Sequence, residues 1–95
     1  MRTPREVFEV VKKMHDRDLH RTMLAICKKY NVTLEAVVSG KRSVRIVEAR
    51  DACVTYLYDV SRFSTTEIGD LFSMHHTSII DAMRRHARRA ATSPP

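Results

Sequence analysis

Hydrophobic residues recur along most of the chain at the three- and four-residue spacing of amphipathic helices. This periodicity predicts helical segments over residues 4–15, 19–30, 34–38, 45–61, 65–72 and 76–89. Helix-breaking residues are rare, because only two glycines are present and the three prolines all lie near the chain ends. We therefore predict an all-α fold, a compact helical domain of five to six helices.

Sequence signals also mark where several of these helices begin and end. Residues 3–6 and 64–67 both place a hydroxyl residue three positions before a glutamate, the spacing of a capping box. The second box predicts a helix start at Thr65. Asn31 and the pair at residues 39–40 (SG) predict helix ends, because Asn and Gly tolerate the left-handed conformation that closes many helices.

The length of 95 residues matches one domain. We predict a single helical domain over residues 1–95, with an N-terminal helical extension at 1–20, a main body at 21–89 and a flexible tail at 90–95. Helix 4–15 is expected to extend the hydrophobic core. The alternative is that it forms a homodimer face, which would double the number of DNA half-sites read.

Lys and Arg number 17 against 11 acidic residues, a formal net charge of +6. A small basic domain favours a polyanionic partner, since phosphates neutralised by Lys or Arg release their condensed counterions. The alternative is a solvated surface with a positive bias, and net charge alone does not distinguish the two.

The two cysteines, Cys27 and Cys53, each lie in an apolar helical pattern. We predict buried thiols in a reducing cytosol, with a structural disulfide as the alternative. No apolar stretch is long enough to cross a bilayer, and no signal peptide is recognised. The expected location is therefore cytoplasmic and nucleoid-associated, with no membrane partner.

Two consecutive helices near the C-terminus, at 65–72 and 76–89, have the pattern of a helix-turn-helix. In the first helix Ile68, Leu71 and Phe72 are expected to pack, and Gly69 to allow close helix–helix approach. The second helix begins with polar side chains that can reach base edges, and carries arginines further along that can meet phosphates. On pattern alone, an ordinary helical bundle is the alternative, with His75 and His76 as cap or surface residues and the arginines as a solvated face.

Three stretches of the chain carry a resemblance to a known family. Residues 39–43 (SGKRS) form a basic loop, residues 49–52 (ARDA) follow it, and residues 64–72 with 76–79 (STTEIGDLF and HTSI) form a paired signature. From residue 23 to residue 89 the sequence resembles the C-terminal DNA-binding domain (domain IV) of the bacterial replication initiator DnaA. The resemblance implies a Trp repressor-like helical fold with a C-terminal helix-turn-helix.

The resemblance also implies roles for individual residues. Arg42 matches the basic-loop arginine that enters the minor groove, and Arg50 matches an arginine that contacts DNA. His76, Thr77 and Ser78 match the base-reading residues of the recognition helix. The complete set predicted to contact DNA is Lys41, Arg42, Arg45, Arg50, Thr66, His75, His76, Thr77, Ser78, Arg84 and Arg85.

The chain departs from the family pattern at several positions. His75 stands where the family has an aspartate that caps the recognition helix and reads a base, and the turn is one residue shorter. Histidine does not cap as a carboxylate does, so Ser73 is expected to cap instead. Glu48 and Asp51 are acids that would weaken binding if they faced phosphate. We therefore expect a target that differs from the usual initiator box.

The predicted function is sequence-specific double-stranded DNA binding, as a transcription regulator of a bacterium or phage. The alternative is a protein–protein adaptor or a competitor that modulates DnaA-dependent replication initiation through replication or transcription proteins. No catalytic residue, metal site or cofactor is predicted, because no phosphate-binding glycine loop, activated nucleophile or cluster of ligands at metal spacing is recognised. A helix bound to an anionic membrane at residues 79–89 is a further alternative.

Overall fold

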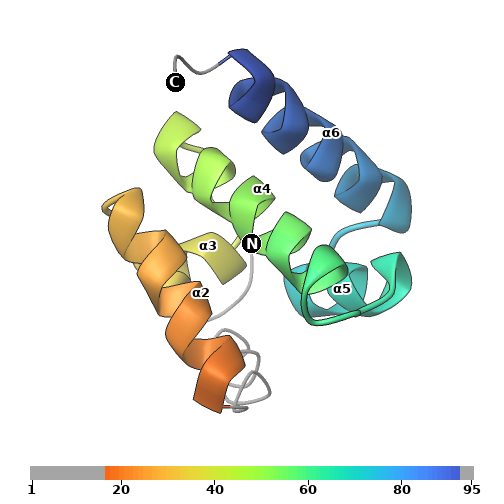
Figure 1. Ribbon diagram of the computed structural model, residues 1–95, viewed down its shortest axis with the longest axis horizontal. Coiled ribbons are helices and arrows are strands. Elements are labelled where there is room, and N and C mark those ends of the chain that lie inside the picture. Colours follow the sequence, from red (N-terminus) through yellow and green to blue (C-terminus); the bar gives the residue numbers. More distant parts are fainter. Residues whose placement is uncertain (1–16, 93–95) are drawn as a thin grey trace. The chain divides into compact units, whose positions relative to one another are not determined.

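The computed structural model describes residues 17–92, which form α-helices and no strand (Figure 1). The helices are α2 (Arg17–Lys29), α3 (Leu34–Val38), α4 (Val44–Asp59), α5 (Thr65–Phe72) and α6 (His76–Thr92). The all-α prediction is therefore confirmed. The predicted helix at residues 4–15 lies outside the described residues, and the single-domain organisation stays a prediction.

The chain divides into two compact units between Arg50 and Asp51, inside α4. The N-terminal unit, up to Arg50, contains α2 and α3, which pack against each other. Its buried apolar side chains are Leu19, Met23, Cys27, Leu34, Val37, Val38 and Ala49. They recur at helical spacing, so hydrophobic burial holds these short helices together.

Asn31 ends α2, as predicted. Its φ of 58° is left-handed, and its N–H donates to Lys28 O at 3.0 Å. The next N–H, of Val32, donates to Cys27 O at 3.0 Å. These two bonds are those of a Schellman motif, which satisfies carbonyls at a helix end. Thr33 then caps α3, because its hydroxyl accepts the Ala36 N–H at 3.1 Å.

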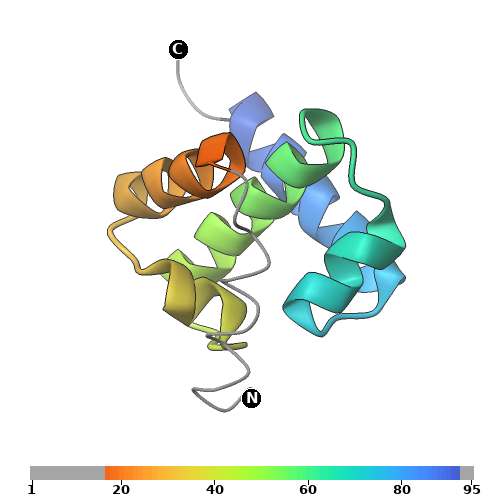
Figure 2. The ribbon, with the colours of Figure 1, turned by 90° about the horizontal axis from the view of Figure 1, so that it is seen from below.

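The C-terminal unit, from Asp51 onward, contains α5 and α6, which lie side by side in both views (Figures 1 and 2). Its buried apolar side chains are Ala52, Cys53, Val54, Leu57, Ile68, Phe72, Ile79 and Ala82. They include the helix-turn-helix residues Ile68 and Phe72, which were expected to pack, whereas Leu71, expected to pack with them, is half-buried. Both predicted buried cysteines are indeed buried.

Several helix bounds differ from the predicted ones, among them α2, which begins at Arg17 rather than residue 19 and ends at Lys29 rather than residue 30. Helix α4 ends at Asp59 rather than residue 61, because Arg62 adopts a left-handed φ of 62° and the Phe63 N–H turns back to Leu57 O at 3.0 Å. Helix α6 continues to Thr92, beyond the predicted end at residue 89, since the residues in between include strong helix formers. None of the described helices combines the length and the apolar character needed to cross a bilayer.

The capping box at the start of α5 is complete. The Glu67 N–H donates to Ser64 Oγ at 3.1 Å, and the Ser64 N–H donates to Glu67 Oε1 at 3.0 Å. The bond from the Ser64 backbone lowers the pKa of Glu67, as does the Ser64 side chain. The carboxylate also lies in the first turn, where the helix dipole favours negative charge.

This geometry predicts a pH-dependent effect of Glu67→Gln, which keeps an acceptor but removes the charge. Because the pKa of Glu67 is lower in the folded chain than in the unfolded one, the charge stabilises the fold at neutral pH. That contribution is lost as the pH falls through the folded-state value. Thermal unfolding should show a higher midpoint for wild type than for the variant at pH 7, and no difference near pH 2. A gap of the same size at both pH values would contradict the assignment.

Candidate nucleic-acid interface

The helix-turn-helix of the C-terminal unit is closed by a tight turn between α5 and α6. Ser73 ends α5 with a left-handed φ of 53°, and its N–H donates to Gly69 O. The Met74 N–H also donates to Gly69 O, at 2.8 Å. Because one carbonyl receives both bonds, the turn backbone lies directly against α5.

Gly69 allows this close approach. A Cβ built at Gly69 would collide with the backbone oxygen of Met74. The sequence predicted close approach at this glycine, but between helices. The structure corrects that detail, since the neighbour is the turn that sets the start of α6.

Gly69→Ala should therefore destabilise the fold, although Gly→Ala in an ordinary helix interior stabilises by about 0.5–1 kcal/mol. The clash is with backbone rather than with a flexible side chain, so the turn must shift. We expect a loss of about 1–3 kcal/mol in the free energy of unfolding, measured by urea denaturation. An unchanged or higher free energy of unfolding would show that the turn backbone can move away from the new Cβ without loss of stability.

His75 occupies the N-cap position of α6. Its backbone carbonyl accepts the N–H groups of Ser78 at 2.9 Å and Ile79 at 3.2 Å, and its ring Nδ1 accepts the Thr77 N–H at 3.3 Å. Ser73, which was expected to take this role, instead stands at the C-cap of α5. The histidine ring therefore accepts a backbone N–H of the first turn, as the side chain of a Ser, Thr, Asp or Asn N-cap does in other helices.

The polar side chains predicted to read bases lie together at the start of α6. His75, His76 and Thr77 are exposed, and Ser78 is half-buried. The rings of His75 and His76 lie with their centroids 4.2 Å apart at an interplanar angle of 36°. This end of the helix therefore presents donors, acceptors and a methyl group to solvent. Thr66 is also exposed, in the first turn of α5.

The two arginines predicted near the middle of α6 have different surroundings. Arg84 is exposed over 74% of its side chain and lies 3.9 Å from Asp81, a weak surface pair. Arg85 instead turns to Asp51, with Nε donating to Oδ2 and Nη2 donating to Oδ1, both at 3.0 Å. The hydrogen bonds that Arg85 donates to Asp51 raise the pKa of Arg85, so this side chain stays charged.

Asp51 is the centre of this cluster and is fully buried, with 1% of its side chain exposed. Arg89 adds a third bond, from Nη1 to Asp51 Oδ2 at 2.7 Å. Asp51 therefore does not face phosphate, the position in which an acid would weaken DNA binding, because its carboxylate is enclosed by two guanidinium groups. The adaptor alternative, which an acid facing phosphate would favour, stays a hypothesis.

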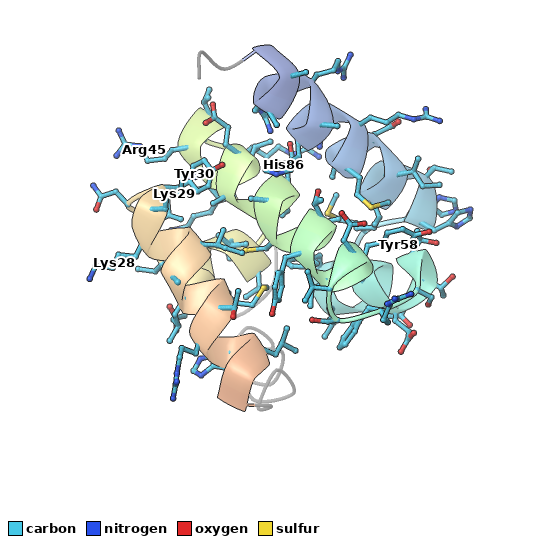
Figure 3. The ribbon with its side chains drawn as sticks, in the orientation of Figure 1. Lys28, Lys29, Tyr30, Arg45, Tyr58 and His86 are labelled. Atoms are coloured by element: carbon cyan, nitrogen blue, oxygen red, sulfur yellow. The ribbon has the colours of Figure 1, made fainter. Side chains whose placement is uncertain are left out.

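In the N-terminal unit, the basic residues of the predicted interface lie in the loop between α3 and α4 and in the first turn of α4. Lys41, Arg42 and Arg45 are all exposed. Figure 3 shows Arg45 extending away from α4, and Lys28 and Lys29 extending away from the last turn of α2. These two lysines were not predicted, although a basic last turn of a helix was visible in the sequence.

Arg50 is placed differently, because it is buried, with 7% of its surface exposed. Its Nε donates to Val37 O at 2.9 Å, and its Nη2 donates to Lys41 O at 2.6 Å. The guanidinium therefore joins the end of α3 to the basic loop. No spacing in the sequence signals this role, since the partners are backbone carbonyls that every residue carries.

Fold and site together define the class of the protein: a helix-turn-helix DNA-binding domain. A family model described as the bacterial dnaA protein helix-turn-helix matches residues 20–85. The match covers more than half of the chain, so the chain belongs to this family of DNA-binding domains. The predicted resemblance is confirmed.

Two curated relatives are both named chromosomal replication initiator protein DnaA. The one from Mycoplasma pneumoniae is 27% identical over 84 residues, and the one from Mycoplasma genitalium is 29% identical over 84 residues. Each alignment covers 86% of this chain but 19% of the relative. The chain thus spans about a fifth of the length of these relatives. No solved structure matches the chain.

Proposed function

We propose that the chain binds double-stranded DNA sequence-specifically, with the start of α6 in the major groove. The observation that carries this proposal is the exposed polar group His75, His76 and Thr77 at the N-terminal end of the second helix of the motif. In helix-turn-helix proteins this end of the recognition helix contacts base edges. Thr77 adds a methyl group that suits a thymine methyl.

The basic loop at residues 39–43 supplies the second part of the proposal. Arg42 is exposed beside Lys41, whose carbonyl is anchored by the buried Arg50. An arginine on an anchored loop loses less conformational freedom on binding than one on a mobile loop. Arg42 is therefore proposed to enter the minor groove, with Lys41 and Arg45 on phosphates. Arg50 is proposed to position the loop rather than touch DNA.

The biological setting proposed first is transcription regulation in a bacterium or phage. The second candidate is competition for the DNA sites of the replication initiator, which the names of the two relatives favour. The departures from the family pattern at the start of α6 favour the first, since a different cap residue is expected to select a different target. The sequence selected by the chain distinguishes the two.

The test is selection of binding sites from a random duplex library, with wild type, Arg42→Ala and Arg21→Ala in parallel. Arg21 is an exposed residue of α2, so it matches Arg42 in charge removed without belonging to the proposed interface. Wild type and Arg21→Ala should enrich one motif, and Arg42→Ala should lose about tenfold or more in affinity for it. Equal behaviour of the two variants would remove Arg42 from the interface. No enriched motif would contradict sequence-specific binding.

A further inference from the structure

The ring of His75 is held by two atoms of one neighbour. Its Nδ1 lies 2.8 Å from the hydroxyl oxygen of Thr77 and accepts the Thr77 backbone N–H at 3.3 Å. Both contacts use the same ring nitrogen, so Nε2 takes no part in either. The ring of His76 lies beside it, with its centroid 4.2 Å away and its plane tilted by 36°.

These contacts decide which ring nitrogen carries the proton. A backbone N–H can only donate, so the nitrogen it points at must be an acceptor and hence unprotonated. In the neutral ring the proton then sits on Nε2. The Thr77 hydroxyl can rotate, and it donates its own proton to Nδ1. Its oxygen lone pairs stay available as acceptors.

We infer that His75 determines base specificity by presenting a fixed Nε2–H donor, and that it selects against cytosine at one position of the target. The inference rests on the proposed function, since it needs the start of α6 to lie in the major groove. Beside this donor, Thr77 presents an acceptor oxygen and a methyl group. The helix start thus offers an ordered donor–acceptor pair rather than an adaptable polar surface.

The groups on the major-groove edges of the bases decide which bases the Nε2–H donor of His75 can pair with. Guanine offers N7 and O6 as acceptors, adenine offers N7 and thymine offers O4. Cytosine offers only its N4 amino group, which is a donor. A donor facing a donor leaves both groups unpaired, so cytosine should be depleted about tenfold at the position that His75 contacts. Guanine, with two acceptors, should be the favoured base.

The experiment compares wild type with Asp and Asn at position 75 in the same random-library selection. Both residues are good N-caps, so both variants are expected to keep α6. With one side-chain oxygen on the Thr77 N–H, His75→Asp presents a second acceptor, whereas His75→Asn presents an amide donor. Cytosine should become the preferred base at one position with His75→Asp, and stay depleted there with His75→Asn. The rest of the motif should be unchanged.

The possible results are distinguishable. If wild type enriches a motif and neither variant changes any position, His75 reads no base, and the inference is overturned while the proposed function stands. If wild type enriches nothing, the proposed function fails and the inference with it. A separate readout uses ¹⁵N NMR of the imidazole ring in the full chain without DNA at pH 8. A proton found on Nε2 supports the inference, and one found on Nδ1 overturns it, whatever the DNA result.

Discussion

Arg50→Ala is expected to lower the free energy of unfolding by about 2–4 kcal/mol, although it removes an arginine that the sequence places among DNA contacts. The substitution leaves Val37 O and Lys41 O without their donor and empties the buried space that the guanidinium fills. The buried Val37 O costs about 1–3 kcal/mol when it is left unsatisfied, and the part-buried Lys41 O costs less because water can reach it. The lost packing of the side-chain stem adds to this cost. Urea denaturation followed by circular dichroism measures the change.

Arg45→Ala is the matched control, because it removes the same charge from an exposed position on the same helix. It should change stability by less than about 0.5 kcal/mol. Arg50→Lys adds a second comparison, since lysine keeps the charge but lacks the planar fork that reaches two carbonyls. If Arg50→Lys kept both the stability and the DNA affinity of wild type, the two hydrogen bonds to backbone carbonyls would not explain the importance of Arg50. A charge contact with DNA would then explain it.

The second large effect is expected for Arg85→Ala, at about 2–4 kcal/mol of unfolding free energy. Breaking a buried ion pair by removing one partner typically costs about 3–5 kcal/mol. The value here should be smaller, because Arg89 still donates to Asp51 and the Arg85 side chain is 38% exposed. The remaining cost is that of a buried carboxylate that has lost its bidentate partner.

Arg84→Ala is the control for this variant, since the neighbouring arginine is 74% exposed and makes only a 3.9 Å surface pair. It should change stability by less than about 0.5 kcal/mol. Thermal and urea unfolding of the two variants side by side make the comparison. Equal small losses for both would show that Asp51 is stabilised by something other than Arg85.

The fold was largely predictable because its signals are local. The helical periodicity, the capping box at Ser64 and the helix end at Asn31 each depend on a few adjacent residues. The end of α4 differs from the predicted one because a single residue, Arg62, adopts a left-handed conformation that its type does not favour. Local chemistry thus decides which elements form, and exceptions arise at single backbone positions.

The site was only partly predictable, because the role of an arginine depends on partners distant in sequence. Arg85 and Asp51 are 34 positions apart, and Arg50 and Val37 are 13 positions apart. An arginine that braces the fold and one that binds phosphate have the same side chain and similar helical spacing. By contrast, Arg42, on the exposed loop, stays a predicted DNA contact.

A cap role for His75 was only an alternative in the sequence, where Ser73 was expected to cap, for a related reason. A histidine accepts a backbone N–H only when its ring is oriented and unprotonated at the facing nitrogen. That condition depends on the turn at Ser73 and on the close approach at Gly69, which fix where α6 starts. The sequence shows the residue types, but not the turn that brings the ring to the Thr77 N–H.

The central claim is that this chain binds one duplex sequence in preference to others. The most direct measurement is a competition titration at near-physiological salt, with a labelled duplex of the selected motif displaced by unlabelled motif or by a scrambled duplex of equal composition. We expect the motif to compete about a thousandfold or more better than the scrambled duplex. Equal competition by the two duplexes would contradict the claim, because the binding would then come from phosphate charge alone.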